Sequence, residues 1–280
     1  MARSIEELLP RPSVMGVVNV TPDSFSDPGR HLEPMAAVAA VADAARDGAA
    51  IVDIGGESTR PGSLGVTVEE ELRRVVPVLE GLAEAGTSVP LSVDTSKAEV
   101  ARRGLELGAV MVNDVTALRA DPALAEIIGE HRALLCLMHM LGEPRTMQQE
   151  PRYDDVVTEV AAFLEQRLAF AVAAGIPEER ICLDPGIGFG KATRHNIELL
   201  LGLRTIASLG RPVLVGVSRK RFLARITGDD VGIVGPLSAS VAVAVLAYER
   251  GASIIRAHDV REHVEALEAA HAFELVNGWK

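Results

Sequence analysis

The feature that most constrains this chain is a short apolar segment that recurs along nearly its whole length, followed each time by a helix-like stretch. Examples are VMGVVN, AIVDIGGE, VPLSVD, VMVN and RICLD. Short runs rich in Val and Ile cannot form a full helix and are typical of strands buried on both faces. Eight such runs alternating with helices predict a (β/α)8 TIM barrel, formed as a single domain by residues 1–280. In this fold the active site lies at the carboxyl ends of the strands.

The expected strands and helices can be assigned approximate residue ranges. The first two strands are expected at residues 14–20 and 51–54, and later ones are expected to end at Asp94, Asn113, His139, Asp184, Ser218 and His258. Helices are expected at residues 35–48, 98–107, 156–174 and 260–273, with two more that begin near Val68 and Pro122. Ser96 is the expected N-cap of the helix at residues 98–107.

Three connecting segments are long and polar, and they follow strands one, two and five. Their sequences are TPDSFSDPGRHLEP, GGESTRPGSLG and MLGEPRTMQQEPRYDD. Connections in α/β proteins are usually short, and loops longer than about 12 residues are usually binding loops or lids. We therefore expect all three on the active face, with the first two acting as mobile covers over a reacting centre.

Charge and composition limit the classes of partner. The net charge of −11 argues against a general nucleic-acid or acidic-membrane surface, so any anion must bind in a local cationic pocket. Cys136 and Cys182 lie in predicted strands and are expected to be buried free thiols, which suits a reducing compartment. MARSIEELLP lacks the apolar core of a signal peptide, and no run reaches the roughly 18 apolar residues of a membrane span. We therefore expect a cytoplasmic protein with neither membrane nor nucleic-acid partners.

Hydrogen-bond acceptors follow the middle strands of the predicted barrel. Asp94, Asn113 and Asp184 each stand at an expected strand end. A planar heterocycle with an amino group and ring N–H donors, such as a guanine-like or pterin-like ring, needs carboxylate and amide acceptors at fixed positions. The alternative is that these residues are helix caps or structural acids.

Cationic side chains follow the last two strands. Lys220, Arg256 and His258 lie where barrels of this kind often bind phosphate. Arg256 and His258 are two residues apart and so project to the same side of their strand. Asn19, on the neighbouring first strand, could help to bind a magnesium-diphosphate group, since Mg²⁺ keeps most of its waters. The alternative is ion pairing of these cations with the acidic background.

The sequence offers no arrangement typical of a covalent nucleophile. It shows no Ser-His-Asp or Cys-His order and no histidine pairing that resembles a metal triad. GIGFGK after strand six lacks the spacing of dinucleotide or P-loop motifs, so its glycines are interpreted as room for close ligand approach. A site with an anion end, a heterocycle end and no nucleophile suits direct displacement of diphosphate.

At this point the residues resemble a known family, the dihydropteroate synthases. The motifs that carry the resemblance span almost the whole chain: NVTPDSFSD at 19–27, GGESTRPG at 55–62, SVDT at 92–95, VNDV at 112–115, MHMLGEPRTMQ at 138–148, LDPGIGFGK at 183–191, VSRKRFL at 217–223 and RAHDV at 256–260. That family joins 6-hydroxymethyl-7,8-dihydropterin diphosphate to 4-aminobenzoate and releases diphosphate, in folate biosynthesis. The resemblance implies a magnesium-dependent transferase that is a homodimer and a sulfonamide target.

The resemblance also assigns roles to residues. It implies that Asp94, Asn113, Asp184 and Lys220 bind the pterin, and that Asn19, Arg256, His258, Thr59 and Arg60 bind diphosphate, with magnesium at Asn19. The implied aminobenzoate site consists of Phe25, Thr59, Arg60, Pro61, Phe189, Ser218 and Lys220. Asp94, Asp184, Lys220 and Asp27 are the implied catalytic residues. Pro28 stands where the family usually has glycine, and it fixes φ and removes a donor in the first long loop.

Three other functions are compatible with parts of the pattern. Methyltetrahydrofolate:corrinoid methyltransferases share the barrel and have a similar pterin-binding site, but they have less need of Arg60, Lys220 and the Arg256–His258 pair. A non-catalytic relative that only binds pterin is expected to lose members of the loop or cation sets, which are all present here. Another diphosphate-using barrel enzyme with a different substrate is the third alternative.

Overall fold

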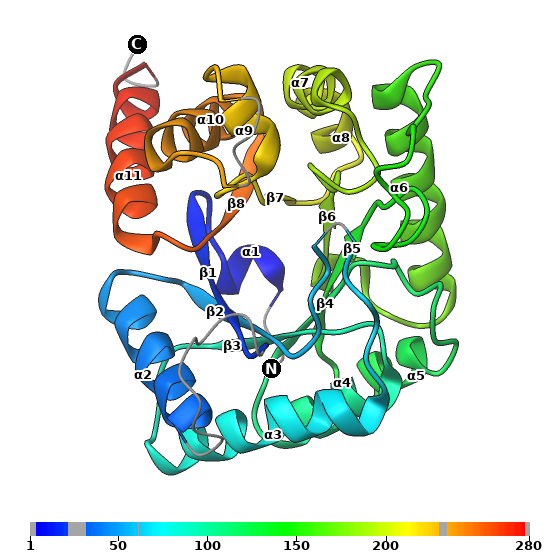
Figure 1. Cartoon of the computed structure of the whole chain (residues 1–280), viewed down its shortest axis with the longest axis vertical. Helices are drawn as coiled ribbons and strands as arrows, with labels where there is room; N and C mark the ends of the chain where they lie inside the picture. Colours follow the sequence, from blue (N-terminus) through cyan, green and yellow to red (C-terminus); the bar gives the residue numbers. More distant parts are fainter. Residues whose placement is uncertain (1–3, 22–31, 61, 230–233, 278–280) are drawn as a thin grey trace.

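The chain forms a closed barrel of eight parallel strands. The computed structural model describes residues 4–21, 32–60, 62–229 and 234–277. The strands are hydrogen-bonded in chain order, and β1 also pairs with β8, which closes the barrel (Figure 1). They are β1 (Ser13–Asn19), β2 (Ile51–Gly55), β3 (Leu91–Asp94), β4 (Met111–Asp114), β5 (Leu134–Met138), β6 (Ile181–Asp184), β7 (Val213–Val215) and β8 (Ala252–Ala257). The expected (β/α)8 fold is confirmed.

Helices surround the barrel and connect successive strands (Figure 1). They are α2 (Leu32–Arg46), α3 (Val68–Glu84), α4 (Ala98–Glu106), α5 (Leu124–Glu130), α6 (Val156–Ala173), α7 (Thr193–Leu201), α8 (Leu203–Ala207), α9 (Arg221–Ile226), α10 (Leu237–Glu249) and α11 (Val260–Asn277), with the 3-10 helix η1 (Glu178–Arg180) before β6. The long connections after β1, β2 and β5 are present as expected, although residues 22–31 of the first lie outside the described residues.

A short N-terminal helix packs against the interior of the barrel. α1 (Ile5–Leu8) begins with a capping box in which Ser4 and Glu7 exchange hydrogen bonds. Ile5 and Leu9 are buried in a cluster with inward-facing side chains, namely Met15, Ile51, Met111, Leu134, Cys136, Cys182, Leu214 and Ile254. Both cysteines are fully buried free thiols, as expected. The lower interior of the barrel is therefore a packed apolar core.

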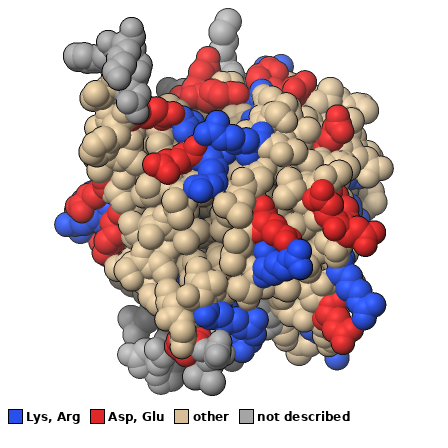
Figure 2. Space-filling model, turned by 90° about the horizontal axis from the view of Figure 1, so that it is seen from above, with Lys and Arg blue, Asp and Glu red and all other residues tan. Residues whose placement is uncertain are grey.

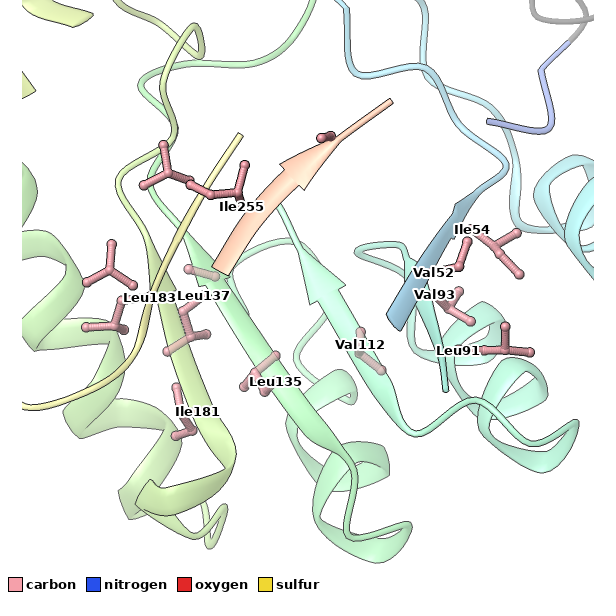
Figure 3. Close-up of a cluster of buried hydrophobic side chains, with 14 of the residues drawn as sticks. Val52, Ile54, Leu91, Val93, Val112, Leu135, Leu137, Ile181, Leu183 and Ile255 are labelled. Atoms are coloured by element: carbon pink, nitrogen blue, oxygen red, sulfur yellow. The ribbon is translucent and has the colours of Figure 1, made fainter. Parts of the chain in front are cut away.

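The outward-facing side chains form a second, larger core with the helices. Successive side chains of a strand point to opposite faces. On β2, Val52 and Ile54 pack in the outer core while Ile51 belongs to the inner one. Figure 3 shows part of the outer core, with labelled residues from β2, β3, β4, β5, β6 and β8. Burial on both faces explains why these segments are apolar runs rather than alternating ones.

Two details of the expected elements are wrong. β7 ends at Val215 and does not reach Ser218, and only Val213 of this strand pairs with β6. Ser96 does not cap α4. Lys97 precedes that helix without a capping side chain, and the backbone N–H of Ala98 donates instead to Asp121 Oδ2 at 2.8 Å.

Charges of both signs are interspersed on the face that Figure 2 shows. Several charged side chains of the described surface form ion pairs, such as Arg219 with Asp259 at 2.5 Å and Arg261 with Asp47 at 2.6 Å. Within the described ranges, no helix combines the length and the apolar character that crossing a membrane requires. The face shown is therefore neither uniformly basic nor uniformly acidic.

Candidate active site

A polar layer lies inside the barrel directly above the apolar one. Side chains two residues apart on a strand point to the same side. Apolar interior residues are therefore followed, two positions later, by polar ones, in the pairs Ile51 and Asp53, Met111 and Asn113, Cys182 and Asp184, and Ile254 and Arg256. The second member of each pair lies at or near the carboxyl end of its strand, where the active sites of such barrels are found.

Arg256 bridges two carboxylates at the centre of this layer. Its Nε donates to Asp53 Oδ2 at 2.8 Å and its Nη2 donates to Asp94 Oδ2 at 3.0 Å. Asn113 Nδ2 also donates to Asp53 Oδ2, at 2.8 Å. The second oxygen of Asp53 and the amide oxygen of Asn113 are buried and accept no hydrogen bond from any described residue. Unpaired buried acceptors are costly, so they favour a ligand that brings N–H donors.

The pKa shifts of two carboxyl groups in this layer also favour a ligand with N–H donors. Burial and the nearby charge of Asp53 raise the pKa of Asp94, and Arg256 opposes this rise only in part. Burial also raises the pKa of Asp184, to about 6, although the backbone N–H of Gly186 donates to its Oδ1 at 2.7 Å and Lys220 opposes the rise. Both carboxyl groups thus lie in an environment where an added N–H donor stabilises the ionised form.

Two residues of the implied aminobenzoate site are in contact. The ammonium of Lys220 lies 4.0 Å from the ring centroid of Phe189, as a cation–π pair. A side-chain carbon at Gly188, whose φ is +84°, would lie 3.1 Å from Lys220 Cδ, so glycine leaves room for the lysine. Burial and the charge of Arg256 lower the pKa of Lys220 to about 8. Lys220 therefore remains mainly charged at neutral pH.

Ser218 and His258 are also brought together. Ser218 Oγ lies 3.2 Å from His258 Nδ1 and accepts a hydrogen bond from the backbone N–H of His258 at 3.2 Å. Burial and then the charge of Arg256 lower the pKa of His258 to about 3. His258 is therefore neutral in this structure, not the cation that the strand-end pattern suggested. The cationic end of the site consists of Arg256 and Lys220.

Asn19 lies near the acceptor layer. A side-chain carbon built on Gly55 would lie 3.5 Å from Asp94 Oδ2 and 3.7 Å from Asn19 Oδ1, so both oxygens border the same position. Asn19 is half-buried. Among the described residues, no group of three or more His, Cys, Asp or Glu side chains could hold a metal ion. A magnesium ion here would have to rely on Asn19, water and phosphate oxygens, which is the usual manner for Mg²⁺.

The second long loop forms a compact turn at its tip. Ser63 Oγ donates to the carbonyl of Ser58 at 2.6 Å, and the Ser63 N–H donates to the carbonyl of Arg60 at 3.0 Å. Thr59 is half-buried and Arg60 is exposed. No described contact joins either of them to the strand-end residues. Four residues named from the sequence lie outside the described residues: Phe25, Asp27, Pro28 and Pro61.

Sequence reasoning missed three residues of this region. Asp53 follows Ile51 at the two-residue spacing of the interior, and that spacing could have identified it. Lys191 and His139 form a buried pair in which Lys191 Nζ lies 2.9 Å from His139 Nδ1 and donates to the carbonyl of Phe189 at 2.9 Å. Burial lowers the pKa of Lys191 to about 7 and that of His139 to about 2, so His139 is a neutral acceptor.

Two of the three glycines after β6, Gly186 and Gly190, are required by backbone packing, and the interpretation that the glycines also allow close ligand approach stays a prediction. Gly186 and Gly190 have φ values of +68° and +63°. A side-chain carbon would lie 1.8 Å from the carbonyl oxygen of His139 at Gly186, and 2.4 Å from that of Leu141 at Gly190. These glycines therefore allow the connection after β5 to pack directly on the connection after β6.

Comparisons with known proteins agree with this geometry. A family described as pterin binding enzyme matches residues 15–258. Dihydropteroate synthase of Escherichia coli K12 is 47% identical, over 94% of this chain and 92% of its own length. The Mycobacterium leprae synthase is 44% identical, over 93% of each chain.

Solved structures give the same result. That of Xanthomonas albilineans dihydropteroate synthase with 4-aminobenzoic acid superposes with a TM-score of 0.87 at 50% identity, covering 95% of this chain and 94% of the other. That of the Burkholderia cenocepacia synthase complexed with 7,8-dihydropteroate has a TM-score of 0.83 at 42% identity, covering 97% and 94%. The chain thus belongs to the dihydropteroate synthase family of pterin-binding enzymes, as its sequence motifs predicted.

Proposed function

We propose that the chain, as one pterin-binding barrel domain, condenses 6-hydroxymethyl-7,8-dihydropterin diphosphate with 4-aminobenzoate to 7,8-dihydropteroate and diphosphate. Family membership supports the reaction, and relatives have been solved with 4-aminobenzoic acid and with 7,8-dihydropteroate. The single observation that carries the residue assignment is the polar layer itself, in which buried acceptors with unsatisfied oxygens adjoin two cationic side chains.

The pterin ring binds among the acceptors. Its amino group and ring N–H groups donate to Asp184 and to the unpaired oxygen of Asn113, and Asp94 accepts from the opposite edge. These interactions replace the internal bond between Arg256 and Asp94, which frees the guanidinium for an anion. Lys220 borders the ring from the β7 side, where it rests on Phe189.

The diphosphate binds at the cationic end. Arg256 can grip a phosphate with two hydrogen bonds, and Lys220 adds a point charge. His258 donates a hydrogen bond from its ring, and a bound anion raises its pKa from the low value of the free site. Thr59 and Arg60 reach the anion from the loop after β2. Asn19 is the residue that would hold Mg²⁺, and the ion would supply added stabilisation of negative charge on the leaving group.

The reaction proceeds by dissociative displacement. The C–O bond between the pterin methylene and diphosphate breaks with its electron pair on oxygen, and the remaining cation is delocalised into the ring. Asp94 and Asp184 stabilise that cation from the ring edges. The neutral amine of 4-aminobenzoate attacks the methylene and then loses one proton, so no strong base is needed. Phe189, Ser218 and Lys220, with Phe25, Pro61 and Asp27 from the long loops, enclose the amine and exclude water.

The assignment is tested by an assay of diphosphate release from the full chain. We expect release with both substrates and Mg²⁺, and little release when aminobenzoate is omitted. Formation of 7,8-dihydropteroate, followed by mass spectrometry, should match diphosphate in a one-to-one ratio. Pterin binding without turnover would contradict the proposal and would favour a non-catalytic role.

We further propose that the enzyme is a cytoplasmic homodimer. The buried, reduced cysteines suit a reducing compartment. Leu201 of α7 and Phe273 of α11 are 62% and 77% exposed, and both line the same surface cavity, of about 560 Å³. The charged residues Arg204, Glu249, Arg250 and Glu274 also line this cavity, and apolar side chains within a polar rim are typical of an interface. Light scattering during size-exclusion chromatography would contradict the proposal if it gave the mass of one chain.

A further inference from the structure

A buried ion cluster lies at the base of the loop after β2, beside the polar layer but outside the set of proposed substrate ligands. The ammonium of Lys97, just before α4, lies 2.5 Å from Glu57 Oε2 and 2.5 Å from Glu71 Oε2. Glu71 is completely buried in the first turn of α3, while Glu57 and Lys97 are about one-fifth exposed. α3 and α4 lie side by side (Figure 1), so the lysine joins the two helices and the loop.

Glu57 holds both ends of the loop at once. Its Oε1 accepts the backbone N–H of Val66 at 3.1 Å, while its Oε2 binds Lys97. The residues between Glu57 and Val66 therefore form a closed turn, which includes Thr59 and Arg60 of the proposed substrate site. Arg74 of α3 fixes the preceding backbone by donating to the carbonyl of Gly56 at 2.8 Å.

The tip of the same loop has fewer attachments. Apart from the internal bonds of Ser63, its described contact with another segment is the Gly62 N–H donating to the carbonyl of Pro144 at 3.0 Å. The direction in which Thr59 and Arg60 project is consequently set by the base. Glu57 fixes the base of the loop and does not itself contact the substrate. A side chain in this position controls how often the tip lies over the carboxyl ends of the strands.

We propose that Glu57, held by Lys97, is a positioning residue for 4-aminobenzoate, and this inference rests on the proposed function. Glu57 fixes the loop that carries Thr59 and Arg60, whereas the pterin is bound by strand-end residues that this loop does not support. Loss of the Glu57 carboxylate should therefore raise the KM for aminobenzoate selectively. Lys97 also follows Asp94 closely in the chain, so the cluster joins the loop to the strand that binds pterin.

The test compares Glu57→Ala and Glu57→Gln with Glu80→Ala in the full chain. Glu80 is also on α3 and pairs with Arg103 at 3.3 Å, but it is about half exposed and lies away from the loop, so it serves as the matched control. Glu57→Ala should raise the KM for aminobenzoate about tenfold, and Glu57→Gln, which keeps one acceptor, should raise it less. The Kd of the free hydroxymethyl pterin, which carries no diphosphate for Thr59 and Arg60 to bind, should stay within twofold of the parent value when it is measured by calorimetry without aminobenzoate.

Hydrogen exchange supplies a readout that does not depend on turnover. Exchange in residues 58–66 should accelerate in Glu57→Ala and stay unchanged in Glu80→Ala. An unchanged KM for aminobenzoate, or an equal rise in both ligand constants, would overturn the inference. Unchanged exchange would overturn it as well. If the parent chain itself released no diphosphate, the proposed function would fail, while the exchange result would still decide whether Glu57 holds the loop.

Discussion

The turn after β6 and the loop after β2 both border the proposed aminobenzoate site, but they are held in different ways. In the turn, backbone groups bond to side chains along most of its length. The Gly188 N–H donates to Asn196 Oδ1 at 2.7 Å, Gln148 donates to the carbonyl of Gly188 at 2.6 Å, and Tyr153 donates to that of Gly190 at 2.9 Å. In the loop, comparable attachments to side chains outside it are concentrated at the base, around Glu57.

Because of this difference, we expect the part of the site beside the turn after β6 and the part beside the loop after β2 to bind their ligands in different ways. Groups already fixed by several hydrogen bonds need little ordering when a ligand arrives, whereas an exposed loop tip loses conformational entropy when it closes. We therefore expect the β6 side, with Asp184, Phe189 and Lys220, to be ready to bind the pterin before any other ligand is present. We expect the loop side, with Thr59 and Arg60, to be completed only when a ligand binds beneath it. Pterin diphosphate should accordingly bind first.

The largest expected effect comes from removing the guanidinium of Arg256, which lies at the centre of the polar layer. Arg256→Ala leaves Asp53 and Asp94 buried without their cation and removes the principal anion ligand. Binding of the diphosphate pterin should weaken by about 2–5 kcal/mol, the usual cost of truncating one member of a buried charge pair. The free hydroxymethyl pterin should lose far less. Calorimetry measures the affinity of each ligand for the variant, and equal losses of affinity would show that Arg256 does not bind the leaving group.

A somewhat smaller effect is expected at Asp184. Asp184→Asn keeps the shape but places an amide donor opposite a ring donor, which leaves buried groups unpaired at about 1–3 kcal/mol. The Gly186 N–H can still donate to the amide oxygen, so the turn itself should persist. Pterin affinity is the measurement, with thermal unfolding as the control for the fold. Parent-like affinity in this variant would mean that the carboxylate is structural.

The same carboxylate predicts a pH dependence. Because burial raises the pKa of Asp184 to about 6, the group carries a proton below that pH and loses acceptor capacity. Pterin affinity should therefore fall below about pH 6, by up to about tenfold per pH unit for one linked proton. Calorimetry between pH 5 and 8 tests this. Asp184→Asn should flatten the profile below pH 6, and any dependence that persists there would come from Asp94, Lys191 or Lys220, whose pKa values are also shifted.

The loop after β2 is tested by measuring how much bound pterin and diphosphate change the affinity for aminobenzoate. If the loop closes over bound diphosphate, aminobenzoate should bind about tenfold to a hundredfold more tightly to the loaded enzyme, a coupling of roughly 1–3 kcal/mol. Titration of aminobenzoate into the free chain and into the chain saturated with pterin and magnesium diphosphate measures it. Equal affinities would mean that the loop after β2 is as preformed as the turn after β6.

Much of this arrangement could be predicted from the sequence because it follows from local rules. The strands are apolar runs because both faces are buried, and Asp94, Asn113 and Asp184 could be found because strand ends share one side of the barrel. The pairs formed by Lys191 with His139, and by Lys97 with Glu57, depend on how separate connections pack. The end of β7 at Val215 depends on which residues pair with the neighbouring strands. Sequence spacing carries no direct information on either, so these features were missed or misplaced.

The smallest expected effect concerns the turn after β6. A substitution that removes one of its hydrogen bonds tests whether the turn depends on any single one of them. Tyr153→Phe removes the hydroxyl that donates to the carbonyl of Gly190 at 2.9 Å but keeps the ring that packs edge-on against His195, with centroids 5.0 Å apart. One lost hydrogen bond should cost about 0.5–1.5 kcal/mol of unfolding free energy. Because Gln148, Asn196 and Lys191 also hold the turn, both substrate constants should stay within twofold. Denaturant unfolding and steady-state assays measure the two quantities. A large rise in the KM for aminobenzoate, without a matching loss of stability, would show that the turn after β6 is nearly as dependent on one contact as the loop after β2.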